Sequence, residues 1–257
     1  MLDAVKSWGY QLQNIKPAKI AASSYDLVVI DYANDDRPFT AAEVAAMQRR
    51  PDGGRRLIVA YLSIGEAETY RSYWNKDWKA RPPSWLGKEN REWRGNYAVH
   101  FWDPQWQQII FGYADRIVAA GFDGLYLDKV DEFELLGHKD EMVAFVAAIS
   151  ARVKAARKEF FVISQNGQEL LEDARFRAAI DGFAREDLFY GEDDDGKRNE
   201  PDSIRESLAL LRGVRADGKP VFVVEYPHGG KQTDEARREI AEQGFVGLTA
   251  RRDLDRL

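Results

Sequence analysis

Apolar residues recur along the chain in short runs, each of which ends in polar residues and is followed by a stretch with helical spacing. Several runs are almost continuously apolar, as in LVVIDY, LIVAYLSI and VFVVEY. Strands that are covered on both faces have this composition, and such strands usually belong to parallel sheets. The pattern therefore predicts eight buried strands, at Trp8–Gln13, Leu27–Tyr32, Leu57–Ile64, Gly124–Asp128, Phe160–Gln165, Ile180–Glu186, Val221–Tyr226 and Val246–Ala250.

The segments between these strands carry helix signals. Thr40–Arg50 opens with the capping-box pair Thr40 and Glu43, and Asp103 can cap a helix over Pro104–Ala120. Strand–helix alternation repeated about eight times predicts an α/β fold, a single (β/α)8 barrel over residues 1–257. An open doubly wound sheet is the alternative, and it is disfavoured because no glycine-rich loop follows the first strand. The other expected helices are Lys139–Lys158, Pro201–Arg215 and Thr233–Gln243, with shorter ones after Lys16 and Gly167.

One long polar segment, Glu66–Tyr97, interrupts the alternation after the third strand. It holds Trp74, Trp78, Trp85 and Trp93. Long loops in compact domains are usually lids or binding loops, and in a barrel this one should hang over the C-terminal mouth. Two interpretations of the tryptophans are open, a platform for sugar rings or part of the core, and their polar surroundings favour the platform.

Composition narrows the class of protein. A length of 257 residues fits one closed barrel, and the net charge of −6 argues against a nucleic-acid binder while allowing a neutral or cationic ligand. The absence of cysteine excludes disulfides, thiol nucleophiles and thiolate metal sites. No apolar run is long enough for a membrane span, and Met1–Gly9 lacks the pattern of a signal peptide. The oligomeric state stays open, and a monomer is compatible with these features.

The strand ends carry the candidate chemistry, because the catalytic groups of a closed barrel come from the C-terminal ends of its strands and the loops after them. Carboxylates stand at five of the eight ends. Clustered like charges cost stability unless a function needs them, and glycoside hydrolysis requires two facing carboxylates. In strand order the candidates are Gln13; Asp31 and Tyr32; Ser63 and Glu66; Asp128 and Asp131; Gln165 and Asn166; Glu186 and Asp187; Glu225 and Tyr226; and Arg251.

Aromatic residues accompany these ends. Alternate residues of a strand face the helices, so about half of the aromatics are expected in the core and the rest at a sugar site. They are Trp8, Tyr10, Tyr32, Tyr61, Tyr126, Tyr190 and Tyr226.

Weaker signals favour other kinds of site. The segment from His228 to Lys231 follows the seventh strand, where many barrels bind phosphate, but a flexible turn into the next helix is the plainer explanation. Asp128, Asp131 and Glu134 could supply oxygen ligands to magnesium or calcium. The chain has three histidines without spaced partners, which gives no basis for a histidine metal site or a Ser-His-Asp triad, so no metal is expected.

Five segments, YDLVVIDY, VAYLSIGEAE, FWDPQWQ, GFDGLYLDKVDEFE and REDLFYGED, resemble glycoside hydrolase family 114. That family comprises the endo-α-1,4-polygalactosaminidase barrels and their bacterial and archaeal relatives, and the resemblance runs from Trp8 to Ala250. It implies a barrel that hydrolyses an amino-sugar polysaccharide without a cofactor, and it favours a place outside the cell or at its surface. This chain departs from the better-known members at Lys129, where they carry asparagine, and by lacking cysteines near the sixth strand.

The resemblance also implies residue roles. The aspartate that opens the D-x-x-D motif on the fourth strand is Asp128, and the glutamate on the sixth strand is Glu186. We expect Asp128 to be the nucleophile, or the base in an inverting variant, and Glu186 to be the general acid, with its pKa raised by apolar and acidic neighbours. The expected substrate contacts are Asp31, Tyr32, Tyr61, Glu66, Asp131, Tyr10, Tyr190, Glu225 and Tyr226, of which Asp31, Glu66, Asp131 and Tyr61 match pocket positions of the family.

Two other functions stay open at this point, a catalytically silent barrel that binds carbohydrate and a barrel lyase or isomerase that uses a carboxylate-bound metal. The retained carboxylate pair favours the hydrolase over the silent binder, because a pure binder does not need it. The acidic cluster further predicts an electronegative pocket and a cationic or partly deacetylated glycan as substrate.

Overall fold

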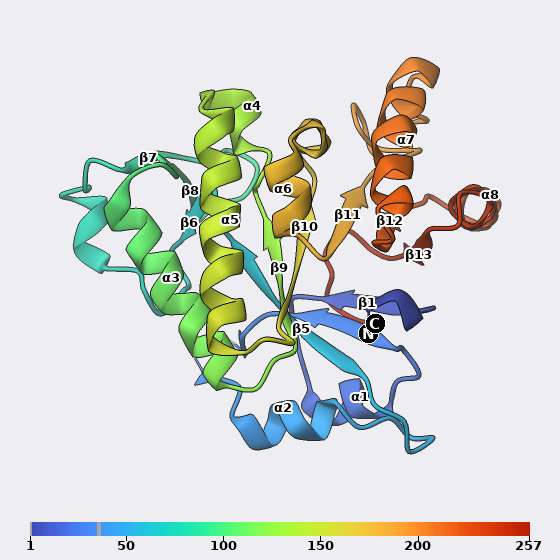
Figure 1. Cartoon of the computed structure of the whole chain (residues 1–257), viewed down its shortest axis with the longest axis horizontal. Helices are drawn as coiled ribbons and strands as arrows, with labels where there is room; N and C mark the ends of the chain where they lie inside the picture. Colours follow the sequence, from blue (N-terminus) through green and yellow to red (C-terminus); the bar gives the residue numbers. More distant parts are fainter. Residues whose placement is uncertain (1, 35–36) are drawn as a thin grey trace.

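The structure of the protein, a computed structural model, describes residues 2–34 and 37–257. Eight parallel strands form one sheet whose spatial order follows the chain without reversal. A doubly wound sheet reverses its order at a switch point, so the barrel prediction is confirmed and the alternative is wrong. The barrel strands are β1 (Trp8–Gln11), β2 (Leu27–Ile30), β5 (Leu57–Ser63), β9 (Gly124–Asp128), β10 (Phe161–Gln165), β11 (Gly182–Glu186), β12 (Val221–Glu225) and β13 (Val246–Thr249) (Figure 1). They differ from the predicted strands only at their ends.

The barrel is nearly closed at the seam between β1 and β13, the two ends of the hydrogen-bonded order. The Trp8 indole donates to the carbonyl of Val246 at 3.0 Å. Beyond the strands, the N–H of Leu12 donates to the carbonyl of Leu254 at 2.8 Å, so the last residues of the chain lie across the seam. Figure 1 shows both termini beside β1.

Helices cover the outside of the sheet, and the predicted capping explains two of them. The side-chain oxygen of Thr40 accepts from the N–H of Glu43, whose carboxylate accepts in return, and Asp103 accepts from the N–H of Gln105 at 2.8 Å. Within the residues described, no helix is long and apolar enough to cross a membrane. The helices are α1 (Pro17–Ala22), α2 (Ala41–Met47), α3 (Pro104–Ala119), α4 (Glu132–Leu136), α5 (Lys139–Ala156), α6 (Ala174–Ala179), α7 (Pro201–Ala216) and α8 (Gly230–Glu242), with 3-10 turns η1 (Leu2–Ala4), η2 (Lys76–Lys79) and η3 (Gln168–Glu172).

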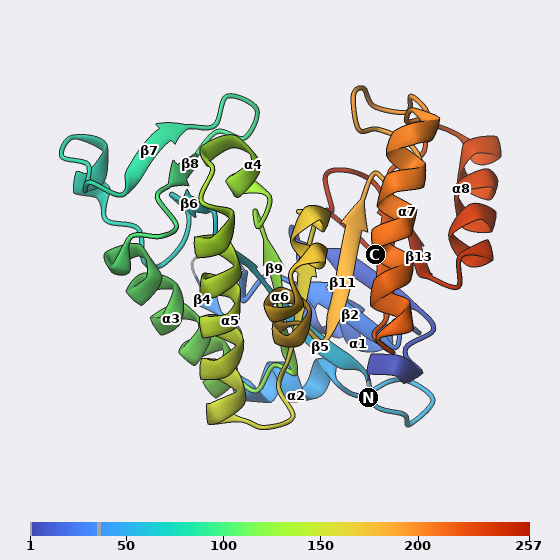
Figure 2. The ribbon, with the colours of Figure 1, turned by 45° about the horizontal axis from the view of Figure 1, so that its top comes forward.

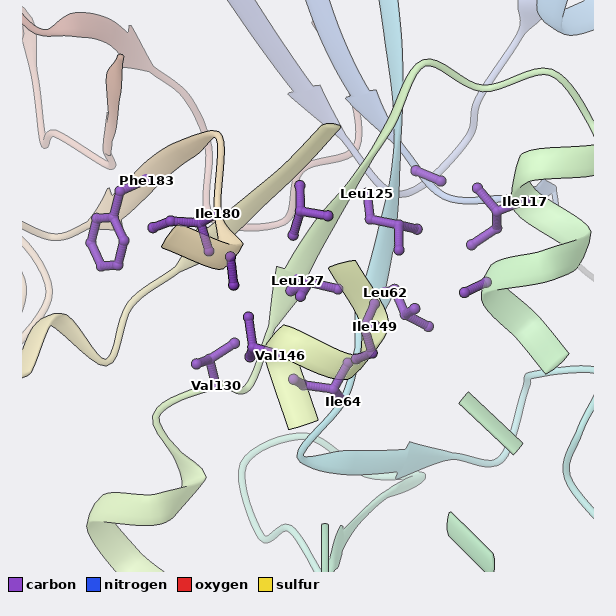
Figure 3. Close-up of a cluster of buried hydrophobic side chains, with 14 of the residues drawn as sticks. Leu62, Ile64, Ile117, Leu125, Leu127, Val130, Val146, Ile149, Ile180 and Phe183 are labelled. Atoms are coloured by element: carbon purple, nitrogen blue, oxygen red, sulfur yellow. The ribbon is translucent and has the colours of Figure 1, made fainter. Parts of the chain in front are cut away.

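Alternation along the strands sorts the core into two layers. On β9, Tyr126 points into the barrel and joins the inner cluster, whereas Leu125 and Leu127 face the helices. The helix-facing layer is the larger of the two, and Figure 3 shows the part of it where β5 and β9 meet α3 and α5. Its labelled members there are Leu62 of β5 and Ile64 directly after it, Leu125 and Leu127 of β9, Ile117 of α3, and Val146 and Ile149 of α5.

The segment after β5 is a small antiparallel sheet rather than a loose loop. It contains β6 (Glu66–Glu68), β7 (Leu86–Glu89) and β8 (Asn96–Val99) in the order β6-β8-β7, and in Figure 2 it stands with α4 above one side of the barrel. A further two-stranded pair, β3 (Ala33–Asn34) and β4 (Arg37–Pro38), follows β2.

Of the four tryptophans of this segment, Trp85 belongs to the core, which contradicts the sugar-platform interpretation there, whereas Trp74 and Trp78 are half-buried against the core. Trp74, Trp78 and Trp85 pack edge to face in a chain, and Trp85 continues the chain to Trp106 of α3 with ring centroids 5.1 Å apart. Because Trp74 also packs on Tyr97 of β8, with ring centroids 5.2 Å apart, this row of rings links the small sheet to α3. Trp93 alone of the four is largely exposed, at 53%.

At the N-terminal ends of the strands, three aspartates hold neighbouring strands in register. Asp26, Asp123 and Asp181 each stand one residue before a strand, namely β2, β9 and β11. Each carboxylate accepts a backbone N–H near the start of the preceding barrel strand, from Ser7 at 3.1 Å, Ile58 at 2.9 Å and Val162 at 2.8 Å respectively. The aspartates therefore satisfy backbone donors that would otherwise be left unpaired at the strand starts.

Candidate functional site

Three adjacent strands, β9, β10 and β11, end in polar side chains that point into the mouth of the barrel. Two residues before each of these side chains, the same strand places a residue in the inner cluster, and alternate residues of a strand share a face. The pairs are Tyr126 and Asp128, Ile163 and Gln165, and Ala184 and Glu186. Register and pleat thus bring one aspartate, one glutamine and one glutamate from consecutive strands to the same place.

The residue after each of these side chains has a left-handed backbone. The φ angles are 57° at Lys129, 58° at Asn166 and 53° at Asp187. Such angles cost a residue other than glycine on the order of 1 kcal/mol and cluster at functional sites. The turn at Lys129 also needs Gly65, because a β-carbon there would lie 2.2 Å from the Lys129 carbonyl oxygen. The backbone therefore turns sharply at the residue directly after Asp128, Gln165 and Glu186.

One amide joins the two carboxylates. The Gln165 Nε2 donates to Asp128 Oδ1 at 2.9 Å and to Glu186 Oε2 at 2.8 Å. On its other side, Gln165 Oε1 accepts from the hydroxyl of Tyr126. Asp128 and Glu186 stand on strands flanking β10, as predicted, and they are tied together by the strand between them.

Tyrosines hold the outer oxygens of the pair. The hydroxyl of Tyr61 donates to Asp128 Oδ2 at 2.7 Å, and that of Tyr226 donates to Glu186 Oε1. Asn166 holds Glu186 twice, because its Oδ1 accepts the Glu186 N–H at 3.1 Å and its Nδ2 lies 3.4 Å from the carboxylate. Both carboxylates are therefore fixed from two sides.

Both members of the pair keep their protons more tightly than ordinary carboxyl groups. Burial raises the pKa of Asp128 to about 6, with a further contribution from the charge of Asp131, while the Tyr61 hydrogen bond opposes the rise. Burial raises the pKa of Glu186 to about 7, followed by the charge of Asp128, with the Tyr226 hydrogen bond opposing it. Because the two groups interact, these pKa values describe the titration of the pair and not of either residue alone.

Asp31 enters the mouth from β2 as part of a buried ion cluster. Its carboxylate accepts from Arg71, whose Nε donates to Glu68 at 2.5 Å. The guanidinium lies over the rings of Tyr61 at 5.6 Å and Tyr70 at 5.1 Å. Two carboxylates on one guanidinium leave this wall of the mouth with a net negative charge.

A second acidic cluster surrounds Lys129. Its ammonium lies 3.0 Å from Glu132 and 3.5 Å from Glu66, and Glu66 also accepts from Asn90 and Asn96. Glu66 is therefore buried and occupied by protein groups.

Asp131 lies close enough to the pair for its charge to raise the pKa of Asp128, and its buried Oδ1 has no protein partner among the described residues. Within the part of the chain that the structure describes, no histidine, aspartate and glutamate side chains are grouped so as to hold a metal ion.

On the opposite side of Glu186, an arginine borders the mouth. Arg252 makes a two-pronged ion pair with Asp187, at 3.0 and 3.1 Å, and lies 4.4 Å above the Tyr226 ring. Tyr226 and Arg252 also line a pocket of about 220 Å³ together with His228. Tyr226, which bonds Glu186, is therefore also part of the lining of this neighbouring pocket.

Three of the expected substrate contacts face away from the mouth, so those expectations are wrong. Tyr32 packs edge to face on Tyr113 in the helix-facing layer, and the hydroxyl of Tyr190 lies 3.2 Å from Glu235 of α8. Glu225 is fully buried, and its Oε1 accepts the N–H of Phe189 at 2.8 Å. Strand alternation explains Tyr32 and Glu225, because each stands next in sequence to an inward residue. Tyr10 does point inward, but it is buried beneath the pair with its ring 5.1 Å from that of Tyr126.

The sequence interpretation missed three residues of the site. Gln165 is one of the candidate strand-end residues, but the sequence pattern assigned it no role, although its phase on β10 matches that of Asp128 on β9. Arg71 and Arg252 come from segments without strand or helix periodicity. Only indirect reasoning could have predicted Arg71 and Arg252: a buried carboxylate such as Asp31 needs a cation or several hydrogen-bond donors beside it.

A parallel barrel with two buried carboxylates joined through one amide at its C-terminal mouth has the arrangement that barrel glycoside hydrolases use. The family comparison agrees with this class. The sequence model of glycoside-hydrolase family GH114 matches residues 3–257, and the chain belongs to that family.

Relatives in sequence span almost the whole chain. A protein of Methanocaldococcus jannaschii is 39% identical over 271 residues, which cover 97% of this chain and 77% of the relative. One of Deinococcus radiodurans is 38% identical over 265 residues, which cover 100% and 83% respectively.

Solved structures share the fold. Ega3 of Aspergillus fumigatus, determined in complex with galactosamine, superposes with a TM-score of 0.74 at 17% identity, over 97% of this chain and 92% of Ega3. The glycoside hydrolase domain of PelA from Pseudomonas aeruginosa superposes with a TM-score of 0.76 at 19% identity, over 99% and 98%. At these identities the likeness is one of fold.

Proposed function

We propose that the protein hydrolyses an α-1,4-linked, galactosamine-rich polysaccharide, with Asp128 as the nucleophile and Glu186 as the general acid. One observation carries the proposal, the pair of carboxylates tied to a single amide, both with raised pKa. Burial raises the pKa of both groups, but the Lys129 ammonium favours the ionised form of Asp128, whereas the charges of Asp128 and Asp187 favour the protonated form of Glu186. A nucleophile must be ionised and a general acid protonated, so the two environments match the two roles.

In the first step, Glu186 donates its proton to the glycosidic oxygen while an oxygen of Asp128 attacks the anomeric carbon. The glycosidic bond breaks, the leaving sugar departs with the proton, and an ester joins Asp128 to the remaining chain. In the second step, the Glu186 carboxylate takes a proton from water, which attacks the same carbon and releases Asp128. Tyr61 and Tyr226 keep both carboxylates in place throughout.

The spacing of the pair favours retention of anomeric configuration. Asp128 Oδ1 and Glu186 Oε2 both lie within hydrogen-bonding distance of Gln165 Nε2, at 2.9 and 2.8 Å. Their separation therefore cannot exceed the two bonds laid end to end, which is below the roughly 6.5–9.5 Å of inverting glycosidases and near the roughly 5–5.5 Å of retaining ones. Little room remains for a water molecule between base and sugar.

The charge of the mouth supports a cationic substrate. The Arg71 and Lys129 clusters each contain two carboxylates for one cation, and Asp131 adds an acceptor without a protein partner among the described residues. An unacetylated galactosamine carries an ammonium group that such a site attracts. Ega3 was solved with galactosamine, which agrees with this substrate class.

The test is incubation with α-1,4-linked galactosamine polymers of different acetylation, with new reducing ends as the readout. We expect products from partly deacetylated polymer, with the α-anomer appearing first by proton NMR and KM rising with salt. Binding measured by calorimetry without new reducing ends would instead favour the catalytically silent barrel. Equal cleavage of fully acetylated polymer would remove the charge argument.

A further inference from the structure

The amide of Gln165 occupies an unusual place, between two carboxylates that must carry different numbers of protons. Its side chain is almost fully buried, at 1% exposure, in the inner layer of the barrel. It has two N–H bonds, and Nε2 lies at hydrogen-bonding distance from both Asp128 and Glu186. The donor capacity of the amide is therefore used completely by the pair.

The orientation of this amide decides whether Asp128 and Glu186 face hydrogen-bond donors or an acceptor. Turned by half a rotation, it would present its carbonyl oxygen, an acceptor, to two carboxylates and repel both of them. The hydroxyl of Tyr126, itself fully buried, meets Gln165 Oε1 from the opposite side. A hydroxyl that donates to the carbonyl end of an amide polarises it and strengthens donation by its N–H groups.

We propose that Gln165, held by Tyr126, is a positioning residue that fixes the spacing of Asp128 and Glu186 by donating to both. This inference rests on the proposed function of the pair. Hydrogen bonds donated to a carboxylate stabilise its ionised form. Without them the two charges repel at short range, so the carboxyl groups move apart and hold their protons to higher pH.

Gln165→Met keeps the length and apolar volume of the side chain while removing both N–H groups and the carbonyl. Tyr126→Phe removes the hydroxyl alone. Matched controls are Gln107→Met in α3, which loses a bond to the Phe101 carbonyl, and Tyr25→Phe, at the opposite end of the barrel. All four variants are first checked for an unchanged circular-dichroism spectrum and a melting temperature close to that of the parent.

The first readout is titration of the side-chain carboxyl carbons by NMR, which needs no substrate. We expect Gln165→Met to raise the apparent pKa values of the pair by about one unit, the size expected for a hydrogen bond to a charged group. Tyr126→Phe should shift them in the same direction by less, and the controls should not shift them. A folded Gln165→Met protein with an unchanged titration would overturn the proposal.

The second readout is the pH dependence of kcat and KM. Gln165→Met should move both limbs of the kcat profile to higher pH and lower the maximal kcat about 10²-fold, with KM nearly constant, since the role is in positioning and not in binding. A raised KM with preserved kcat would also overturn it. If the parent protein cuts none of the polymers, the proposed function fails, while the NMR titration still decides the role of Gln165.

Discussion

Carboxylates lie at both ends of this barrel, but the pKa of Asp26 at one end is lowered whereas those of Asp128 and Glu186 at the other end are raised. At the N-terminal end, burial alone would raise the pKa of Asp26, but the backbone N–H groups of Lys6 and Ser7 and the charge of Arg50 lower it overall. At the C-terminal mouth, Asp128 and Glu186 face each other, and burial with like charge raises both pKa values.

The difference lies in what each carboxylate meets. Asp123 accepts from the backbone of Ile58, from Gln48 and from Arg55, so its charge is matched by donors of the fold itself. Asp128 and Glu186 accept hydrogen bonds from neutral groups, the shared amide of Gln165 and the hydroxyls of Tyr61 and Tyr226, so each charge is less fully compensated than that of Asp123 beside Arg55. The N-terminal carboxylates therefore stabilise the barrel, whereas the raised pKa values of Asp128 and Glu186 suit them to transfer protons.

The largest expected effect separates the two ends by activity. Asp128→Asn and Glu186→Gln should each lower kcat by about 10³-fold or more, because each removes a group that acts in the bond-breaking step. Asp123→Asn should leave kcat within about twofold, because it is confined to the other end of the barrel. Steady-state kinetics on galactosamine polymer measures both. Near-parental hydrolysis by either of the first two variants would exclude that residue from catalysis.

A smaller effect separates the ends by stability. Asp123→Asn should lower the free energy of unfolding by about 2 kcal/mol, because it weakens bonds to buried donors and unpairs Arg55. The exposed pair of Asp115 with Arg152, 2.7 Å apart, offers the control, and Asp115→Asn should cost about 0.5 kcal/mol or less. Urea unfolding at pH 7 gives both values. Equal costs for the two variants would contradict the assigned role of the N-terminal aspartates.

The smallest effect concerns pH. Because the folded-state pKa values of Asp128 and Glu186 lie above their unfolded values, the folded protein loses stability as pH rises from about 4 through about 7. Asp128→Asn and Glu186→Gln remove this loss, so they should melt a few degrees above the parent at pH 8, at about 2–4 °C per kcal/mol, and approach it at pH 4. Thermal melts across this range provide the measurement. A variant that melts below the parent at pH 8 would show that its carboxylate stabilises the fold.

The sequence by itself determined the eight strands, the capped helices at Thr40 and Asp103, and the two carboxylates that end β9 and β11. These follow from local physics, since apolar runs, caps and strand ends are written in consecutive residues. Tertiary structure alone decided which side chains meet. The pleat turned Tyr32 and Glu225 outward, and packing buried Trp85 of the insertion in the core with Trp74 and Trp78 half-buried beside it. Arg71 and Arg252 came from irregular segments far apart along the chain. Gln165 became the link between Asp128 and Glu186 only when β10 was placed between their strands, because a hydrogen bond depends on register and distance in space, which no spacing along the chain records.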